Sequence, residues 1–394
     1  MKTRLMATAL GMLAATGAWA DHHEVKVGIS LGFTGPLESL APPMAGGAEM
    51  AMTEVSESGK LLDGKTISPV QGDSTCVDAG AAVATGERLV GEGVKAIMGA
   101  MCSGATGAVL SNVALPNGIV MISPSATSPA LSTVEDNGLF FRTAPSDARQ
   151  GVVMAEIIKE KGYNEVALTY TNNDYGKGLA DSFAAAFTEH GGTVTLNAPH
   201  EDGKGDYSAE VGALASAGGE VLVVAGYVDQ GGSGIIQASL DTGAFDTFVL
   251  PDGMVGAVLE ENFGSDLDGS FGQLPGSDSE GAKVFAEMVG DKFDPTSPYA
   301  GESYDAAALM LLAMQAANST DASVFKEKII EVANAPGEEI LPGELSKALE
   351  ILAQGGDVNY VGASDVEMLP VGESAGRYRV IEIEDGKIVT TGFK

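Results

Sequence analysis

Three short turns in the sequence combine hydroxyl side chains, glycine and a carboxylate, and each follows a run of apolar residues. The turns run from Gly99 to Thr106, from Ser123 to Thr127 and from Pro251 to Gly253. Hydroxyls such as that of Ser103, together with free N–H groups at a helix N-terminus, bind anions such as a carboxylate. Asp252, in the third turn, carries the charge that could hold an ammonium group. The turns alone leave open the alternative that Ser103 and Thr127 only cap helices.

The sequence contains none of the residue patterns that are typical of common catalytic sites. The turn from Gly99 to Thr106 imitates a phosphate-binding loop, but Ala105 stands where that loop needs a lysine. No G-x-S-x-G or H-E-x-x-H motif is present, and no histidine lies near the hydroxyl-rich turns in the sequence. An enzyme would need a base and a nucleophile within reach of each other. We therefore expect a protein that is not an enzyme and uses no metal or cofactor.

The segments that must position these turns alternate between apolar strands and helices. Strand-like runs occur near residues 25–30, 66–70, 95–98 and 118–122, and a second series occurs near 165–170, 193–196, 220–224 and 248–250. Continuous apolar strands separated by helices indicate parallel sheets that are covered on both faces. Two such series predict an α/β fold of two doubly wound lobes. Ligands of such sheets bind beyond the carboxyl ends of the strands, where the three turns lie.

The first 20 residues have the features of a secretory signal peptide. Lys2 and Arg4 precede a mostly apolar stretch, and Ala18-Trp19-Ala20 forms an A-x-A cleavage site. We expect cleavage before Asp21 and a periplasmic location. Removing 20 of the 394 residues leaves 374, more than one hydrophobic core usually serves. With 54 acidic and 22 basic residues, the protein should repel nucleic acid and anionic membranes.

The two cysteines, Cys76 and Cys102, both remain in the exported chain, where thiols are normally oxidised. A bond between them would stabilise the fold by roughly 3–4 kcal/mol on the chain-entropy estimate. Their spacing is not that of the redox motif C-x-x-C. We therefore expect a structural disulfide.

Several motifs occur in an order and spacing that are distinctive when taken together. They are Val27 to Pro36, the Cys76/Cys102 pair, Ser123 to Thr127, Asn173 to Gly178, Gly226-Tyr227, Pro251 to Gly253 and Tyr304 to Ala307. On these motifs, nearly the whole mature chain resembles the leucine/isoleucine/valine-binding family, the type I periplasmic binding proteins of ABC transporters. The resemblance implies two Rossmann-like lobes joined by three hinge crossings. Lobe 1 would then comprise residues 21–142 and 274–358, and lobe 2 residues 143–273 and 359–394.

The resemblance also implies which residues contact the ligand. Ser103, Ser125 and Thr127 would hold a ligand carboxylate from lobe 1, and Asp252 would hold an ammonium group. Tyr175 and Tyr227 would close over the ligand from lobe 2.

The pocket for the ligand's side chain is where the sequence departs from the family pattern. The branched-chain binders carry an aromatic residue after the Gly35-Pro36 turn, and Leu40 takes that position here. We expect Leu40, Met101 and Tyr299 to line the pocket, with Glu302 as a rival to Asp252 for the ligand's positive charge.

The function that this resemblance implies is the capture of an amino acid, branched-chain or similar, in the cleft between the lobes. The protein would be a monomer and would deliver its ligand to the permease subunits of an ABC transporter. Two alternatives remain open. The ligand could be an amide, urea or organic acid without an ammonium group, or the protein could be a periplasmic sensor subunit or enzyme on the same scaffold.

Overall fold

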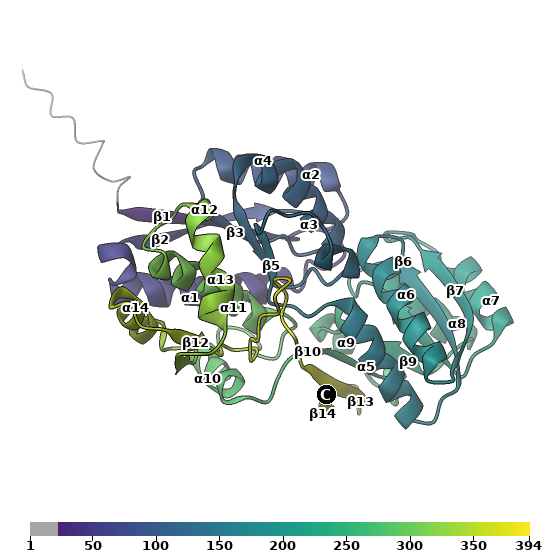
Figure 1. Ribbon diagram of the computed structural model, residues 1–394. Helices are drawn as coiled ribbons and strands as arrows, with labels where there is room; N and C mark the ends of the chain where they lie inside the picture. The colour runs from purple at the N-terminus through teal and green to yellow at the C-terminus, as the bar shows by residue number, and fades with distance from the viewer. Residues whose placement is uncertain (1–22) are drawn as a thin grey trace, which may run out of the picture.

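The strands of the protein form two separate sheets, each with helices packed against it, so that the chain folds into two lobes (Figure 1). The computed structural model describes residues 23–394. The predicted signal peptide and its cleavage site before Asp21 lie outside these residues. No helix among residues 23–394 is long and apolar enough to cross a membrane. The two sheets with their helices confirm the predicted α/β fold class.

The sheet of lobe 1 has five parallel strands in the order β2-β1-β3-β4-β5. They are β1 (Glu24–Leu31), β2 (Thr66–Asp73), β3 (Ala96–Gly99), β4 (Val120–Ser123) and β5 (Phe140–Arg142). Its helices are α1 (Ala41–Ser58), α2 (Ala79–Gly91), α3 (Ser103–Val109), α4 (Leu115–Asn117), α10 (Glu280–Val289), α11 (Ala300–Ala316), α12 (Ala322–Phe325), α13 (Ile329–Ala333) and α14 (Leu345–Ala353). A small sheet pairs β11 (Glu338–Ile340) with β12 (Val358–Tyr360). Every residue of β3, β4 and β5 is buried, which is why these strands read as unbroken apolar runs.

The sheet of lobe 2 has seven strands in the order β14-β13-β10-β9-β8-β6-β7. They are β6 (Glu165–Thr171), β7 (Thr193–His200), β8 (Val221–Ala225), β9 (Phe248–Leu250), β10 (Phe271–Pro275), β13 (Tyr378–Glu384) and β14 (Lys387–Phe393). Its helices are α5 (Asp147–Glu160), α6 (Asp174–Glu189), α7 (Ser208–Ala217), α8 (Gly231–Thr242) and α9 (Ala257–Phe263). The strands β6 to β10 pair in parallel, whereas β13 is antiparallel to β10 and β14 is antiparallel to β13.

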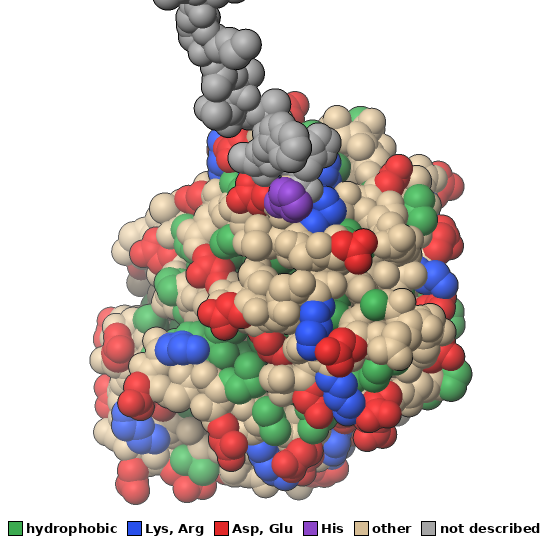
Figure 2. All heavy atoms as spheres, turned by 90° about the vertical axis from the view of Figure 1, so that its left-hand side faces the viewer, with side chains coloured by type: hydrophobic (Ala, Val, Ile, Leu, Met, Phe, Trp, Pro, Cys, Tyr) green, Lys and Arg blue, Asp and Glu red, His purple; other side chains and the backbone are tan. Residues whose placement is uncertain are grey.

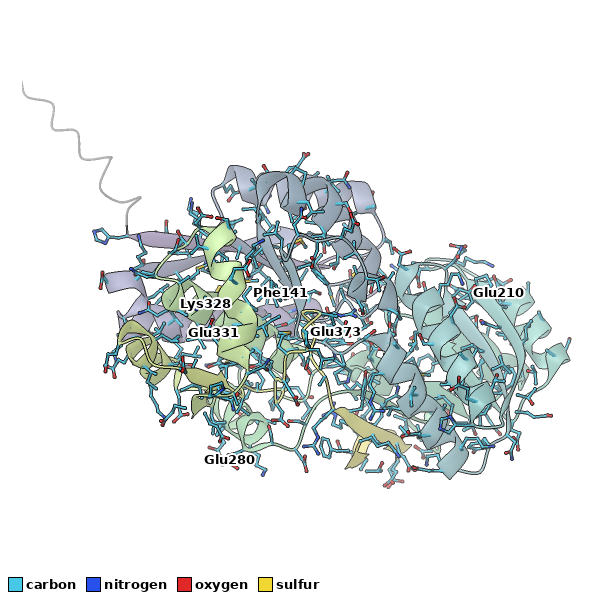
Figure 3. All side chains as sticks on the ribbon, in the orientation of Figure 1. Phe141, Glu210, Glu280, Lys328, Glu331 and Glu373 are labelled. Atoms are coloured by element: carbon cyan, nitrogen blue, oxygen red, sulfur yellow. A yellow bond between two sulfur atoms is a disulfide. The ribbon has the colours of Figure 1, made fainter. Side chains whose placement is uncertain are left out.

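The chain passes between the lobes at three places. It leaves the lobe 1 sheet after Arg142 and leaves the lobe 2 sheet after Pro275. The segment from 361 to 374 still bonds to lobe 1, because Ser364 donates to Asp305 and the carboxylate of Glu373 lies 2.6 Å from the guanidinium of Arg142 (Figure 3). The chain enters the second sheet only at β13. We therefore propose that the third crossing lies between residues 374 and 378, and not at the predicted residue 358.

Close packing between α1 and α11 fixes the start of α11 at the edge of the cleft. Gly47 lies in α1, and a Cβ atom there would come within 2.2 Å of the main-chain oxygen of Ala300. The two backbones therefore meet where only glycine fits. This contact positions Tyr299 and Glu302, which lie at the N-terminus of α11.

Acidic side chains are spread over the surface rather than gathered in one patch. Figure 2 shows one such face, on which red acidic side chains alternate with fewer blue basic ones. The excess of acidic side chains on this face agrees with the net charge of −32.

Candidate ligand-binding site

A small cavity lies where the two lobes meet, and most of the predicted site residues line it. Its walls are formed by Leu37, Leu40, Met101, Cys102, Ser103, Ser125 and Tyr299 from lobe 1 and by Tyr175, Tyr227, Asp252 and Gly253 from lobe 2. The open space is about 20 Å³, enough for roughly one water molecule. A larger ligand can enter only if the lobes or the tyrosine side chains move.

Asp252 is the centre of a hydrogen-bond network that joins the two lobes. One carboxylate oxygen accepts bonds from Gln150 Nε2 and from the Tyr175 hydroxyl, each at 2.8 Å. The other accepts a bond from the Tyr299 hydroxyl at 2.5 Å. Burial raises the pKa of Asp252, although the bonds from Tyr299, Gln150 and Tyr175 offset part of that rise. The buried carboxylate of Asp252 is thus bonded by donors from both lobes.

Tyr175 and Tyr227 form an aromatic wall on the lobe 2 side. Their rings stack with centroids 5.2 Å apart. Tyr175 lies at the start of α6, whose first turn is fixed by the side chain of Asn173 accepting a bond from Gly176 N–H. The Tyr175 hydroxyl also accepts a bond from the N–H of Gly253. The aromatic wall is therefore tied to the turn that carries Asp252.

The lobe 1 hydroxyls lie at different depths. Ser103 Oγ accepts a bond from Ser128 N–H at 3.1 Å, and Ser125 Oγ donates to the main-chain oxygen of Met101 at 2.7 Å. Both residues line the cavity. Thr127 does not line it; its hydroxyl is buried beside the carboxyl group of Asp147. Ser103 and Ser125 therefore remain the hydroxyls that a ligand could reach directly.

A disulfide holds the hydroxyl-bearing turn of lobe 1 in place. Cys76 and Cys102 are bonded, with their Cα atoms 5.1 Å apart, which confirms the prediction. The bond ties the loop after β2 to the residue that precedes Ser103. A Cβ atom at Gly32 would come within 2.9 Å of Cys76 Sγ, so the disulfide packs directly on the end of β1.

A buried acid that the sequence analysis did not single out, Asp147, lies near Asp252 and its hydrogen-bond network. Asp147 begins α5 and has no exposed surface, and the Thr127 hydroxyl lies beside its carboxyl group. Burial raises the pKa of Asp147 well above the ordinary value, the charge of Asp252 raises it further, and the Thr127 hydroxyl lowers it in part. The signal in the sequence was an acid directly after a helix-capping serine, Ser146, at the first lobe crossing.

Glu302 lies outside the cavity that contains Asp252. It lines a neighbouring cavity instead, and Tyr299 contributes to the walls of both. The expected pocket residues Leu40, Met101 and Tyr299 are brought together, but the structure does not place Glu302 with them. Glu302 was expected in this pocket because it lies close to Tyr299 in the sequence. Closeness in sequence does not show on which side of the helix end each side chain lies.

Two Rossmann-like lobes that enclose a cavity, lined by apolar side chains and a few hydrogen-bonding groups, are the arrangement of hinged ligand-binding proteins. The periplasmic binding protein family matches residues 24–338, and the chain belongs to this family, as predicted. Leu/Ile/Val-binding protein homolog 1 of Brucella melitensis is 32% identical over 339 residues, which is 83% of this chain and 88% of the relative. The leucine-specific-binding protein of Salmonella typhimurium is 27% identical over 314 residues, 79% of this chain and 83% of the relative.

Solved structures show the same fold. A leucine-binding protein from Thermotoga maritima superposes with a TM-score of 0.79 at 23% identity, covering 94% of this chain and 98% of the other. A branched-chain amino acid transporter substrate-binding protein from Streptococcus pneumoniae, in complex with isoleucine, has a TM-score of 0.76 at 22% identity and covers 94% and 99%.

Proposed function

We propose that the protein captures an amino acid with an apolar side chain between its lobes and delivers it to the permease of an ABC transporter. It would do so in the periplasm, as a monomer, after removal of residues 1–20. The observation that carries this proposal is the cavity in which Asp252 of lobe 2 faces the hydroxyls of Ser103 and Ser125 of lobe 1. A carboxylate on one side and neutral donors on the other match the two charges of an amino acid.

The ligand's ammonium group would bind Asp252. In the structure the hydroxyls of Tyr175 and Tyr299 and the amide of Gln150 already donate to this carboxylate. An ammonium group entering from the cavity would replace the Tyr299 bond, in which only the acceptor is charged, with one in which donor and acceptor both carry charge. The pKa of Asp252, raised by burial, would fall as the ammonium group binds.

The ligand's carboxylate and side chain would both bind on lobe 1. Ser103 and Ser125 supply hydroxyls that can turn toward a carboxylate, and Thr127 would join them when the lobes readjust around the ligand. Leu37, Leu40 and Met101 supply an apolar surface for the side chain. An aliphatic side chain fits this surface, because the aromatic groups of the cavity stand on the other walls.

Transport rather than catalysis is favoured by the relatives and by the residues at hand. The relatives are named for binding leucine, isoleucine or valine. Among the described residues that line the cavity there is no histidine or lysine to act as a base. Binding would favour closure only through contacts that the open form lacks, and ligand contacts to both lobes meet this condition.

A thermal-shift screen of the mature protein, followed by calorimetry, tests the proposal. Leucine, isoleucine and valine should raise the melting temperature, bind with one-to-one stoichiometry in the cleft and be recovered unchanged. The matched amides and the corresponding carboxylic acids without an amino group should bind more weakly. Preference for an amide or an organic acid would favour the alternative ligand class, and sustained conversion of any bound ligand would show an enzyme.

A further inference from the structure

A second cavity of about 390 Å³ lies beside the first, against the two later lobe crossings. Its walls come from the start of α11 and the loop before it in lobe 1, and from β13 and β14 in lobe 2. This volume falls in the range of small-molecule sites. Four charged side chains line it. Asp278 and Lys283 pair with Arg377 and Glu280, which leaves Glu302 from lobe 1 and Arg379 from lobe 2.

Glu302 is a buried acid whose carboxyl group is bonded only by its own main-chain N–H among the described residues. It is 5% exposed, and among residues 23–394 no other side chain donates a hydrogen bond to its carboxyl group or pairs with it. Its backbone is fixed, because its main-chain oxygen accepts a bond from the Thr143 hydroxyl at the first crossing. Burial raises the pKa of Glu302 to about 7. A buried carboxyl group is costly unless a donor or a positive charge completes its bonding.

Arg379 is also only partly satisfied. Its Nη2 donates to the main-chain oxygen of Thr296 at 2.9 Å, but its Nε is buried and has no partner among the described residues. Burial lowers the pKa of Arg379, and the charges of Glu302 and Asp294 oppose that change. Within the described chain Arg379 and Glu302 form no ion pair with each other, although both line the same cavity. The space between them is bounded by a donor on one side and an acceptor on the other.

We propose that this cavity is a second ligand site, which takes a small zwitterion whose carboxylate binds Arg379 and whose ammonium group binds Glu302. A ligand of this class supplies the partner that each side chain lacks, and it cancels both buried charges at once. An anion alone would leave Glu302 unpaired, and a cation alone would leave the Arg379 Nε unpaired. The proposal does not depend on the identity of the ligand between the lobes.

The position of the site couples it to lobe closure. Glu302 belongs to lobe 1 and Arg379 to lobe 2, so a ligand that bonds to both holds the lobes in the arrangement described here. Tyr299 lines both cavities and donates to Asp252. Occupancy of the second site therefore favours the closed form, and by linkage a ligand in the first cavity should tighten binding in the second.

Calorimetry on the full mature protein carrying Asp252→Ala tests the proposal, because this change weakens the first site at a residue that does not line the second cavity. The probes are glycine, β-alanine and γ-aminobutyrate, which differ in the distance between their charges, with acetate and methylammonium as single-charge controls. We expect saturable one-to-one binding of at least one zwitterion. Glu302→Gln and Arg379→Lys, each added to Asp252→Ala, should weaken it by at least about tenfold. Arg88→Gln should not, because this exposed arginine of α2 pairs with Glu92 and does not line the cavity.

The pH dependence gives a second readout. In the Asp252→Ala protein, the zwitterion should bind more tightly at pH 8 than at pH 6, because the pKa of Glu302 is about 7. Adding Glu302→Gln should remove this difference. If no zwitterion binds, if acetate binds equally well, or if Glu302→Gln has no effect, the proposal is wrong. Should Asp252→Ala fail to fold, Asp252→Asn provides the same background. If the protein without substitutions binds no amino acid in the first cavity but the zwitterions still bind in the second, that result would count against the proposed function and not against the second site.

Discussion

The hydroxyl of Tyr299 in lobe 1 donates a hydrogen bond to a carboxylate oxygen of Asp252 in lobe 2, at 2.5 Å. This bond joins the lobes directly across the cavity that we propose as the ligand site. Asp252 also accepts bonds from Gln150 and Tyr175 on its own lobe, so one buried carboxylate is hydrogen-bonded to residues of both lobes. Ligand recognition and lobe closure therefore meet at the same group.

Replacing Tyr299 with Phe should loosen the closed form of the ligand-free protein. A hydrogen bond to a charged group contributes about 1.5–3 kcal/mol, so its loss should shift the lobe equilibrium toward open conformations. Small-angle scattering should show a larger radius of gyration for Tyr299→Phe than for the parent without ligand. Tyr163→Phe, the same change at a half-buried tyrosine of lobe 2 that does not line the cavity, is the control. Equal radii for all three proteins would contradict the prediction.

Asp252→Ala should abolish tight binding of an amino acid. Breaking a buried ion pair on one side typically costs about 3–5 kcal/mol, because the remaining charge stays desolvated. At about 1.4 kcal/mol per tenfold, affinity for leucine should fall by roughly a hundredfold or more. Glu302→Ala is the matched acidic control, and calorimetry measures both. If Glu302→Ala weakens leucine binding and Asp252→Ala does not, the ammonium group binds at Glu302 instead.

Ser103→Ala should weaken binding of the ligand's carboxylate by about 1.5–3 kcal/mol, since one hydrogen bond to a charged group is lost. The hydroxyl also accepts the Ser128 N–H, so the variant should lose stability as well. The ratio of the affinities for leucine and leucinamide separates the two effects, because leucinamide lacks the carboxylate. That ratio should fall in Ser103→Ala; an unchanged ratio would exclude a direct contact with the carboxylate.

The disulfide should be complete in protein recovered from the periplasm and should stabilise the fold. Alkylation without reductant, followed by mass spectrometry, should label neither Cys76 nor Cys102. The two cysteines are 26 residues apart, and closing such a loop contributes about 3.5 kcal/mol on the chain-entropy estimate. The double variant Cys76→Ser/Cys102→Ser should unfold at correspondingly lower denaturant. Free thiols in periplasmic material would disprove the pairing in the exported protein.

The stability of the protein should fall between about pH 4.5 and pH 7 in part because of Glu302. Folding raises the pKa of this group from 4.5 to about 7, so the folded protein binds the proton more tightly than the unfolded chain does. Its contribution is therefore fully present below the unfolded pKa and is lost as pH rises toward about 7, by up to about 3 kcal/mol. Glu302→Gln should flatten this part of the pH profile in denaturant unfolding, whereas the exposed control Glu280→Gln should not. Parallel profiles for Glu302→Gln and the parent would refute the assignment.

The sequence by itself determined the strands and helices that carry the site. Apolar runs such as residues 96–98 and 119–122 predicted strands buried on both faces, and the structure has β3 and β4 there. The turns that follow them contribute Ser103 and Ser125 to the cavity between the lobes. The cysteine pair followed from the export signal. These inferences hold because they depend on neighbours along the chain.

Only the tertiary structure decided which groups meet across the lobes. Residues 378–393 join the lobe 2 sheet as β13 and β14, although their mixed polar and apolar residues gave no strong strand signal. Asp147 came close to Asp252, and Glu302 was assigned to a different cavity from Asp252. Segments far apart in the sequence decide whether a residue is buried and which groups it bonds to. They also decide on which side of a helix end its side chain lies. Local pattern fixes the elements, but the electrostatics of the site arise only when the two lobes come together.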